Sequence, residues 1–311
     1  MRPARWIVAL LLLLAPLPLY ATTYYVTVAG LGGEPDYDQR FIANAMELDK
    51  IFKSLNDAHV YTLTGAEATK ARFNEVMAMI AHQAKSDDAL IVTLIGHGSY
   101  DGSEYKFNLV GPDISASELA AICDQVHASR QLIVNTTSAS GGSIAPLQHV
   151  GRGVIAATKS GTEKNATVFA RYWVEALQDP ASDVDKSDAI SAMEALRYAD
   201  RKTAAFYDAQ KRLATEHAVF EDTGHGDPVK VSAAEGREGS LLANLTVVRI
   251  GTAQAAMNDP AKRDLMRKKE ELEQEIDALK YQKAAMEPGE YKKQLTAALL
   301  KLAKVQEDLE K

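Results

Sequence analysis

The sequence predicts an α/β protein, a three-layer α/β/α sandwich around a mostly parallel sheet, followed by a C-terminal α-helical hairpin. Short apolar runs rich in β-branched residues, such as 89–95 and 131–135, are typical of fully buried parallel strands. These runs alternate with amphipathic stretches of helical length, which favours crossover connections between parallel strands. Beyond Met257 the sequence becomes rich in Lys, Glu and Leu, with apolar residues at heptad spacing, which predicts paired helices.

The N-terminal residues have the pattern of an export signal. A basic start is followed by the apolar run Trp6 to Leu19, and Ala21 is a small residue at a cleavage point. The run is shorter than the ~20 residues that span a bilayer. We therefore expect a signal peptide over residues 1–21 and a secreted or periplasmic protein, which is membrane-anchored if the segment stays uncleaved.

Composition limits the partners and the sources of stability. The net charge is −7, and no basic patch is interleaved with aromatic residues, so nucleic acid is not an expected partner. Cys123 is the only cysteine, which excludes an intrachain disulfide. An ordinary apolar core must stabilise this chain.

Periodicity and turn residues place the remaining elements. Besides the two buried runs, we expect strands at 24–30, 59–63, 153–158 and 241–250. We expect helices at 41–55, 69–85, 115–128 and 167–177, a helix through Arg201 and a helix end at Glu216-His217, with a hairpin over 100–109. These elements form one domain over residues 22–252, and residues 258–311 form the helical hairpin.

Two strand ends carry the residues that are able to do chemistry. The run 89–95 is followed by Gly96-His97-Gly98, and the run 131–135 by a hydroxyl-rich turn that ends in glycines. Reactive groups in open α/β sheets lie just beyond the carboxyl ends of the strands. A histidine and a hydroxyl group are therefore expected side by side, which is the arrangement of a base and its nucleophile.

This arrangement resembles the caspase-like cysteine peptidases, and within them the legumain-like family, over roughly residues 24 to 250. In that family a His-Gly follows one core strand and a Cys-x-Ser-Gly turn follows the next. Gly96-His97-Gly98 matches the first element, and Ser138-Ala139-Ser140-Gly141 matches the second. Ser138 stands where the family carries its nucleophilic cysteine.

The resemblance implies a role for each matched residue. His97 would be the acid/base group, the backbone N–H of Gly98 an oxyanion donor, and Ser140 the counterpart of the family's own serine. Arg40 is placed like a specificity arginine that pairs with an Asn or Asp side chain of the substrate. A surface arginine at the start of a helix is the alternative for Arg40.

The sequence alone does not determine which residue is the nucleophile and which is the base. Besides Ser138, the hydroxyls of Thr136, Thr137 and Ser140 lie in the turn, and His149 and His217 are further candidates for the base. A serine needs a tightly bonded base that a third group orients, and Asp101 is a candidate for that group.

Two functions follow. One is an exported, non-catalytic caspase-like protein that binds a peptide or partner protein at this site. The other is an endopeptidase that uses Ser138 with His97 to cleave after Asn or Asp. Neither function requires a cofactor.

The segment 183–194 has the spacing of a calcium-binding EF-hand loop. Side-chain oxygens fall at loop positions 1, 3, 5, 9 and 12, the ninth being Ser191, and the predicted ligands are Asp183, Asp185, Ser187, Ala189 through its backbone carbonyl, and Glu194. Asp188 replaces the glycine that normally permits the sharp turn. The alternative is an acidic helix cap by Ser187 or Asp188. A second acidic segment, 221–227, is expected to be a solvated turn.

The C-terminal stripe predicts an antiparallel pair of helices. Its apolar positions lie on either side of Pro288-Gly289: Leu265, Leu272, Ile276, Leu279 and Met286, then Leu295, Ala298, Leu302, Val305 and Leu309. The stripe is compatible with packing on itself, docking on the preceding domain, or pairing between chains. We expect it to support a homo-oligomer or to recruit a partner.

Overall fold

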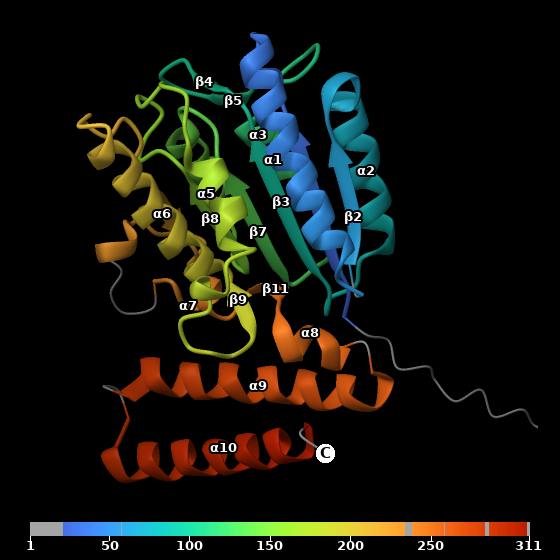
Figure 1. The fold of residues 1–311 in the computed structure, drawn as a ribbon, viewed down its shortest axis with the longest axis vertical. Coiled ribbons are helices and arrows are strands. Elements are labelled where there is room, and N and C mark those ends of the chain that lie inside the picture. The colour runs from blue at the N-terminus through green and yellow to red at the C-terminus, as the bar shows by residue number, and fades with distance from the viewer. Residues whose placement is uncertain (1–20, 57, 234–237, 258, 284–285, 310–311) are drawn as a thin grey trace, which may run out of the picture.

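A computed structural model describes residues 21–56, 58–233, 238–257, 259–283 and 286–309. The expected signal segment lies outside these ranges except for Ala21. The centre of the fold is a six-stranded sheet in the order β10-β8-β7-β3-β1-β2 (Figure 1). Its strands are β1 (Thr23–Ala29), β2 (Ala58–Leu63), β3 (Ala89–Ile95), β7 (Arg130–Asn135), β8 (Arg152–Ala156) and β10 (Val219–Glu221). Only β10 is antiparallel to its neighbour, so the prediction of a mostly parallel sheet is confirmed.

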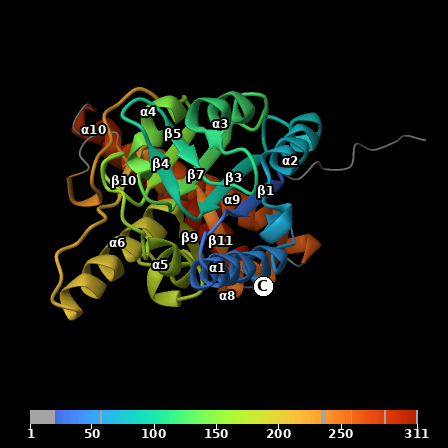
Figure 2. The same ribbon diagram turned by 90° about the horizontal axis from the view of Figure 1, so that it is seen from above.

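Helices cover both faces of the sheet, which confirms the three-layer sandwich (Figure 2). One face carries α1 (Pro35–Lys53), α5 (Phe169–Ala176) and α6 (Ala192–Ala209). The other carries α2 (Lys70–Gln83), α3 (Ala116–Cys123) and α4 (Ile144–Leu147). Two large apolar clusters fill the space between the layers, one containing Trp173 and the other Phe73. Successive side chains of β3 alternate between these clusters, as the pleat of a strand requires.

Shorter elements connect the main ones. The predicted hairpin is part of a three-stranded sheet of β4 (Gly98–Tyr100), β5 (Tyr105–Phe107) and β6 (Ile114–Ser115). Short 3-10 turns complete the connections: η1 (Gly65–Glu67), η2 (Ser140–Ser143), η3 (Pro180–Ser182) and η4 (Val231–Ala233).

Several predicted boundaries were wrong. The strand expected at 241–250 is instead α7 (Ser240–Ala243) followed by β11 (Thr246–Arg249), and β11 pairs with β9 (Ala189–Ser191) outside the main sheet. The helix expected to end at 216–217 ends at Ala209, because Lys211 adopts a left-handed conformation with φ of 54°.

Two further boundaries differ at helix ends. α6 is capped by Ser191, in a reciprocal capping box with Glu194, and not by Ser187 or Asp188. α3 ends at Cys123 and does not continue to 128.

The C-terminal helices pack at the amino-terminal end of the strands. α8 (Gly251–Met257) leads into α9 (Pro260–Gln282), which is antiparallel to α10 (Pro288–Leu309) below the sheet in Figure 1. The hairpin has its own apolar cluster, which includes Ile276, Leu279 and Ala298. Among the described residues, no helix is long and apolar enough to cross a membrane.

Polar contacts fasten α9 to the body. Arg249 of β11 makes a bidentate ion pair with Glu270, with Nε–Oε1 and Nη2–Oε2 distances of 2.5 and 3.0 Å. The ammonium group of Lys269 donates to the carbonyl of Ser187 at 2.7 Å. The hairpin therefore touches the body through β11 and through the 183–194 loop.

Cutting the chain after Met257 should leave a folded domain that melts cooperatively. The two clusters that flank the sheet draw no buried residue from beyond Val248, so their packing does not depend on α9 or α10. We expect Tm to fall by roughly 2–4 °C for each kcal/mol lost at the α9 contact. Thermal melting by circular dichroism is the measurement, with Glu270→Gln in the full chain as a control for the ion pair. Light scattering should show any oligomer dissociating, and outright unfolding would make the hairpin an integral layer of the core.

Candidate functional site

The pairing of β3 with β7 builds the candidate site. The two strands are parallel, with Leu94 opposite Asn135. Beyond the last pair, the backbone N–H and the hydroxyl of Thr136 both donate to the Leu94 carbonyl, at 3.0 and 2.7 Å. The segments that follow the two strands therefore start side by side at the carboxyl edge of the sheet.

Gly98 and Ser138 are in direct contact at this edge. The Gly98 N–H donates to Ser138 Oγ at 3.1 Å, and that hydroxyl donates to the Gly98 carbonyl at 2.9 Å. A Cβ atom added to Gly98 would lie 2.5 Å from the Ser138 carbonyl oxygen, so only glycine fits this approach. The predicted nucleophile and the predicted oxyanion donor are thus bonded to each other, and Ser138 is buried.

His97 directly precedes Gly98 in the segment after β3, but its side chain faces α1. Its ring packs edge-on against Tyr37 and Phe41, with centroid distances of 4.7 and 5.1 Å. Arg40 is exposed and stacks over the Tyr37 ring at 4.7 Å. Within the described part of the chain, no hydrogen bond joins His97 to Ser138.

The surroundings of His97 lower its pKa. Burial is the largest cause, and the positive charge of Arg40 lowers the pKa further. The backbone of Gly32 and the carboxylates of Asp38 and Glu34 oppose these effects only in part. The imidazole is therefore uncharged at neutral pH.

The turn after β7 is rigid and buried. Ala139 adopts a left-handed conformation with φ of 57°, and its N–H donates to the Glu163 carbonyl at 2.8 Å. Ser140 lies 3.2 Å from the Thr158 hydroxyl and accepts the Thr158 N–H at 3.0 Å. Ser140, predicted to bind substrate, is fully buried, so in this arrangement its hydroxyl holds the turn to the loop after β8.

The Thr137 hydroxyl and the Asp101 carboxylate, which was the candidate for orienting His97, both bond to groups other than the His97 ring and the Ser138 hydroxyl. Thr137 Oγ1 bonds Tyr105 at 2.6 Å and Asn135 Oδ1 at 2.8 Å in a buried network. Asp101 is exposed and accepts backbone N–H groups of its own loop. Burial raises the pKa of the Cys123 thiol to about 12, so this cysteine is no substitute nucleophile.

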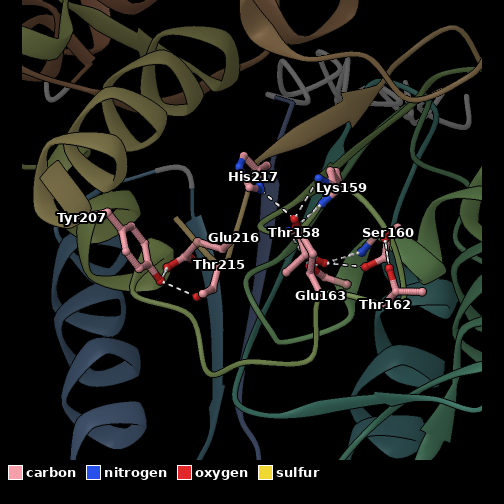
Figure 3. A network of polar contacts seen from close by, with 11 residues as sticks. Thr158, Lys159, Ser160, Thr162, Glu163, Tyr207, Thr215, Glu216 and His217 are labelled. Atoms are coloured by element: carbon pink, nitrogen blue, oxygen red, sulfur yellow. Dashed lines mark hydrogen bonds and ion pairs between the residues drawn. The ribbon is translucent and has the colours of Figure 1, made fainter. Parts of the chain in front are cut away.

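The two alternative histidines occupy different edges. His149 is exposed and lies just before β8, at the amino edge of the sheet. His217 precedes the antiparallel β10, so it lies at the carboxyl edge. Its Nδ1 is 2.6 Å from Glu163 Oε1, and Lys159 Nζ is 3.4 Å from the same oxygen (Figure 3).

Glu163 is a residue of this edge that the sequence analysis missed. Its carbonyl holds the turn at Ala139 while its carboxylate orients His217. The loop 157–168 gives no local sign of this role, because His217 is 54 residues away. In Figure 3, Glu216 forms a neighbouring group with Tyr207 and Thr215.

Glu216 has a structural role. Its carboxylate accepts the backbone N–H groups of Val168 and Phe169 at the start of α5, at 2.8 and 3.2 Å. Burial raises its pKa, although these bonds and the Tyr207 hydroxyl favour the charged form. A buried carboxylate from a distant segment thus caps this helix.

The 183–194 loop brings its predicted carboxylates together. One oxygen each from Asp183, Asp185 and Glu194 lies within 4.8 Å of the others. Asp188 makes the sharp turn that glycine normally makes, with φ of 63°. β9 then pairs with β11 before α6 begins.

The same oxygens already have partners within the loop. Asp183 accepts N–H groups from Ser187 and Asp188, at 3.0 and 3.1 Å. Glu194 accepts from Val184 with one oxygen and from Ser191 with the other. The Ser187 hydroxyl is 3.3 Å from the Ala189 carbonyl. These bonds hold the loop in shape and compete with a cation for the same oxygens.

The second acidic segment is a turn with exposed residues at 225 and 227, as expected, but its first two carboxylates are not solvated. Glu221 is buried and accepts the N–H groups of Thr223, Gly224 and Gly226. Asp222 is also buried and accepts the N–H of Leu242 in α7. Both carboxylates hold backbone in place.

The comparisons with known proteins concern the fold. No protein-family model and no curated protein matches the chain. Over 68% of this chain and 82% of the other, it is similar to the crystal structure of the Drosophila initiator caspase Dronc, at 11% identity and a TM-score of 0.45. Over 67% of this chain and 95% of the other, it is similar to a protein from Geobacter sulfurreducens, at 12% identity and a TM-score of 0.46. At these values neither structure informs the chemistry of this chain.

Replacing Arg40 by Gln should raise the pKa of His97. The guanidinium charge lowers that pKa in the wild type, so its removal shifts the titration of the imidazole upward while burial still opposes protonation. The measurement is an NMR titration of the His97 ring. Arg72→Gln on α2 is the matched control, because Arg72 is also exposed and pairs with Glu75. An unchanged His97 titration in Arg40→Gln would show that the two groups do not interact.

The 183–194 loop should bind calcium weakly at most. Its carboxylates converge, but their bonds to backbone N–H groups must yield, so we expect a Kd no tighter than about 10⁻⁴ M. Calorimetry of wild type and Asp185→Asn measures this, since Asp185 is exposed and outside the capping box. Glu194→Gln provides a second comparison. A tight heat of binding that either substitution abolishes would contradict the prediction.

Proposed function

We propose that this chain is an exported, non-catalytic relative of the legumain-like peptidases that binds a peptide or partner protein at the carboxyl edge of β3 and β7. The single observation that carries this proposal is the hydrogen bond from Ser138 to the Gly98 carbonyl. A serine nucleophile must donate its proton to a base, and this hydroxyl donates to a backbone oxygen instead.

The position of the oxyanion donor supports the same conclusion. The Gly98 N–H is bonded to Ser138 Oγ, so it is not directed at a substrate carbonyl. His97 packs edge-on against α1, and among the described residues no carboxylate is hydrogen-bonded to its ring. Each catalytic role is represented, but the pairs that catalysis requires are not formed.

Arg40 supports a peptide as the ligand. Its charge is exposed beside His97, and the Tyr37 ring restrains the guanidinium without neutralising it. A guanidinium of this kind pairs with the carboxylate or amide of an Asp or Asn side chain. The hairpin of α9 and α10 would then recruit a partner or a second copy at the other end of the molecule.

An active serine endopeptidase is the second candidate. It is favoured by the uncharged imidazole of His97, because a general base must be unprotonated to accept a proton. It would require Ser138 to rotate away from Gly98 toward His97 when substrate binds. The following experiment separates the two.

Replacing Ser138 by Cys should create hydrolysis of peptides after Asn or Asp, by roughly 10²-fold or more over wild type. An unperturbed thiol has a pKa of about 8.5, far closer to neutrality than a hydroxyl, and it bonds weakly to a carbonyl, so it does not need the tight base that serine needs. The assay is the turnover of fluorogenic peptides. Ser99→Cys is the matched control, because it places a thiol on an exposed residue next to Gly98.

Wild-type protein should bind the same peptides in fluorescence anisotropy without turning them over. Hydrolysis by wild type that Ser138→Ala abolishes would establish the endopeptidase instead. If neither wild type nor Ser138→Cys binds or cleaves any peptide of the library, the carboxyl edge is not a peptide site.

A further inference from the structure

Asp88 is a buried carboxylate at the amino end of the sheet, far from the candidate site. It directly precedes β3 and is 5% exposed. Its Oδ1 accepts the Thr22 backbone N–H at 2.7 Å, and its Oδ2 accepts the Lys85 N–H at 2.9 Å. Both oxygens therefore bond to backbone and not to a side chain.

The carboxylate has no cationic side chain beside it. Across the described ranges, no Lys, Arg or His side chain lies within ion-pair distance of Asp88, although other carboxylates such as Asp49, Asp124 and Glu270 do form ion pairs. Burying a carboxylate is costly unless an opposite charge or several hydrogen bonds compensate. Two backbone N–H groups compensate Asp88, and a positive charge close to its Oδ1 would stabilise the buried carboxylate further.

We propose that export processing supplies this charge, by cleavage after Ala21 that turns Thr22 N into the α-ammonium partner of Asp88. This inference rests on the export included in the proposed function. A signal-cleaving peptidase hydrolyses the Ala21–Thr22 bond: the hydroxyl of water goes to the Ala21 carbonyl carbon, and its proton to the Thr22 nitrogen. The released amine takes a further proton from solvent, because an α-amino group has a pKa of about 7.7–8.0.

The backbone already holds the nitrogen where the charge is needed. The Thr22 carbonyl accepts the Ala89 N–H at 3.0 Å while the Thr22 N–H bonds Asp88. Thr22 is therefore fixed on both sides of its own Cα atom, next to the first residue of β1. The amide-to-ammonium change converts the existing 2.7 Å hydrogen bond to the carboxylate into an ion pair between two charged groups without moving the chain.

The surroundings leave this ion pair accessible to water on one side. Ala21 and Thr22 line a cleft of about 610 Å³ between the sheet and α9. Other charged groups that line it are Asp87, Arg130, Arg263, Arg267, Glu270 and Glu271. Their signs are mixed, so the cleft neither repels nor neutralises a new ammonium group strongly, and the bonded, buried Asp88 is its partner.

Three forms of the full mature chain test the ion pair. One begins at Thr22 with a free amine, one begins at Thr22 with an acetylated amine, and one begins at Ala21. Acetylation keeps the Thr22 N–H and its hydrogen bond but removes the charge, so it isolates the ion pair. We expect the free Thr22 form to have the highest Tm, by roughly 2–4 °C.

Asp88→Asn completes a double-mutant cycle. We expect it to lower the Tm of the free Thr22 form more than that of the acetylated form, because only the former loses an ion pair. Equal Tm values for the free and acetylated forms, or equal effects of Asp88→Asn in both, would overturn the proposal. The comparison of the two Thr22 forms stands even where Asp88→Asn fails to fold.

The intact mass of the protein released by an exporting bacterial host tests the cleavage. We expect the mass of residues 22–311. Export with processing at another bond would overturn this inference and leave the proposed function standing. Retention of the full chain in the host would instead contradict the export on which both rest.

Discussion

The parallel pairing of β3 with β7 is the constraint on which the rest of the candidate site depends. Its register brings Leu94 opposite Asn135, and the bonds of Thr136 to the Leu94 carbonyl continue the ladder past the last strand residue. A slip by one residue would turn every side chain of one strand to the opposite face and would break the bonds between Thr136 and Leu94. The contact between Gly98 and Ser138 follows from this register.

The bonds that make the turn rigid also remove its hydroxyl groups from chemistry. Asn135 receives the Thr137 hydroxyl and donates to Ser143 at 3.0 Å, while Ser140 is tied to Thr158. Buried polar groups need hydrogen-bond partners. In this buried turn the hydroxyl and amide side chains find those partners in one another and in the backbone. Ser138 follows the same rule with Gly98. A thiol at that position would be a weak donor, so the backbone of Gly98 would hold it less firmly.

Local patterns predicted the buried strands, their alternation with helices and the two polar strand ends. They failed where contacts between residues far apart in the sequence determine the secondary structure or the pairing of side chains. The apolar residues of 241–250 are as suitable for a strand as for a helix followed by a strand, and Asp222 selects the helix by accepting the N–H of Leu242. The pairing of His217 with Glu163 spans 54 residues. No periodicity reports such a contact, because each partner looks like an ordinary surface residue in its own segment.

The attachment of the hairpin follows from the short ribbon of β9 and β11. The 183–194 loop leads into β9, which pairs with β11, and both contacts to α9 arise from this unit: Ser187 accepts from Lys269, and Arg249 pairs with Glu270. Movement of the loop would therefore disturb the hydrogen bond and the ion pair that attach α9 to the body. The carboxyl edge of β3 and β7 lies at the other end of the strands, so His97 and Arg40 are remote from α9 and α10 (Figure 1). The two ends of one parallel sheet thus offer separate surfaces, because parallel strands direct all their carboxyl ends to one side.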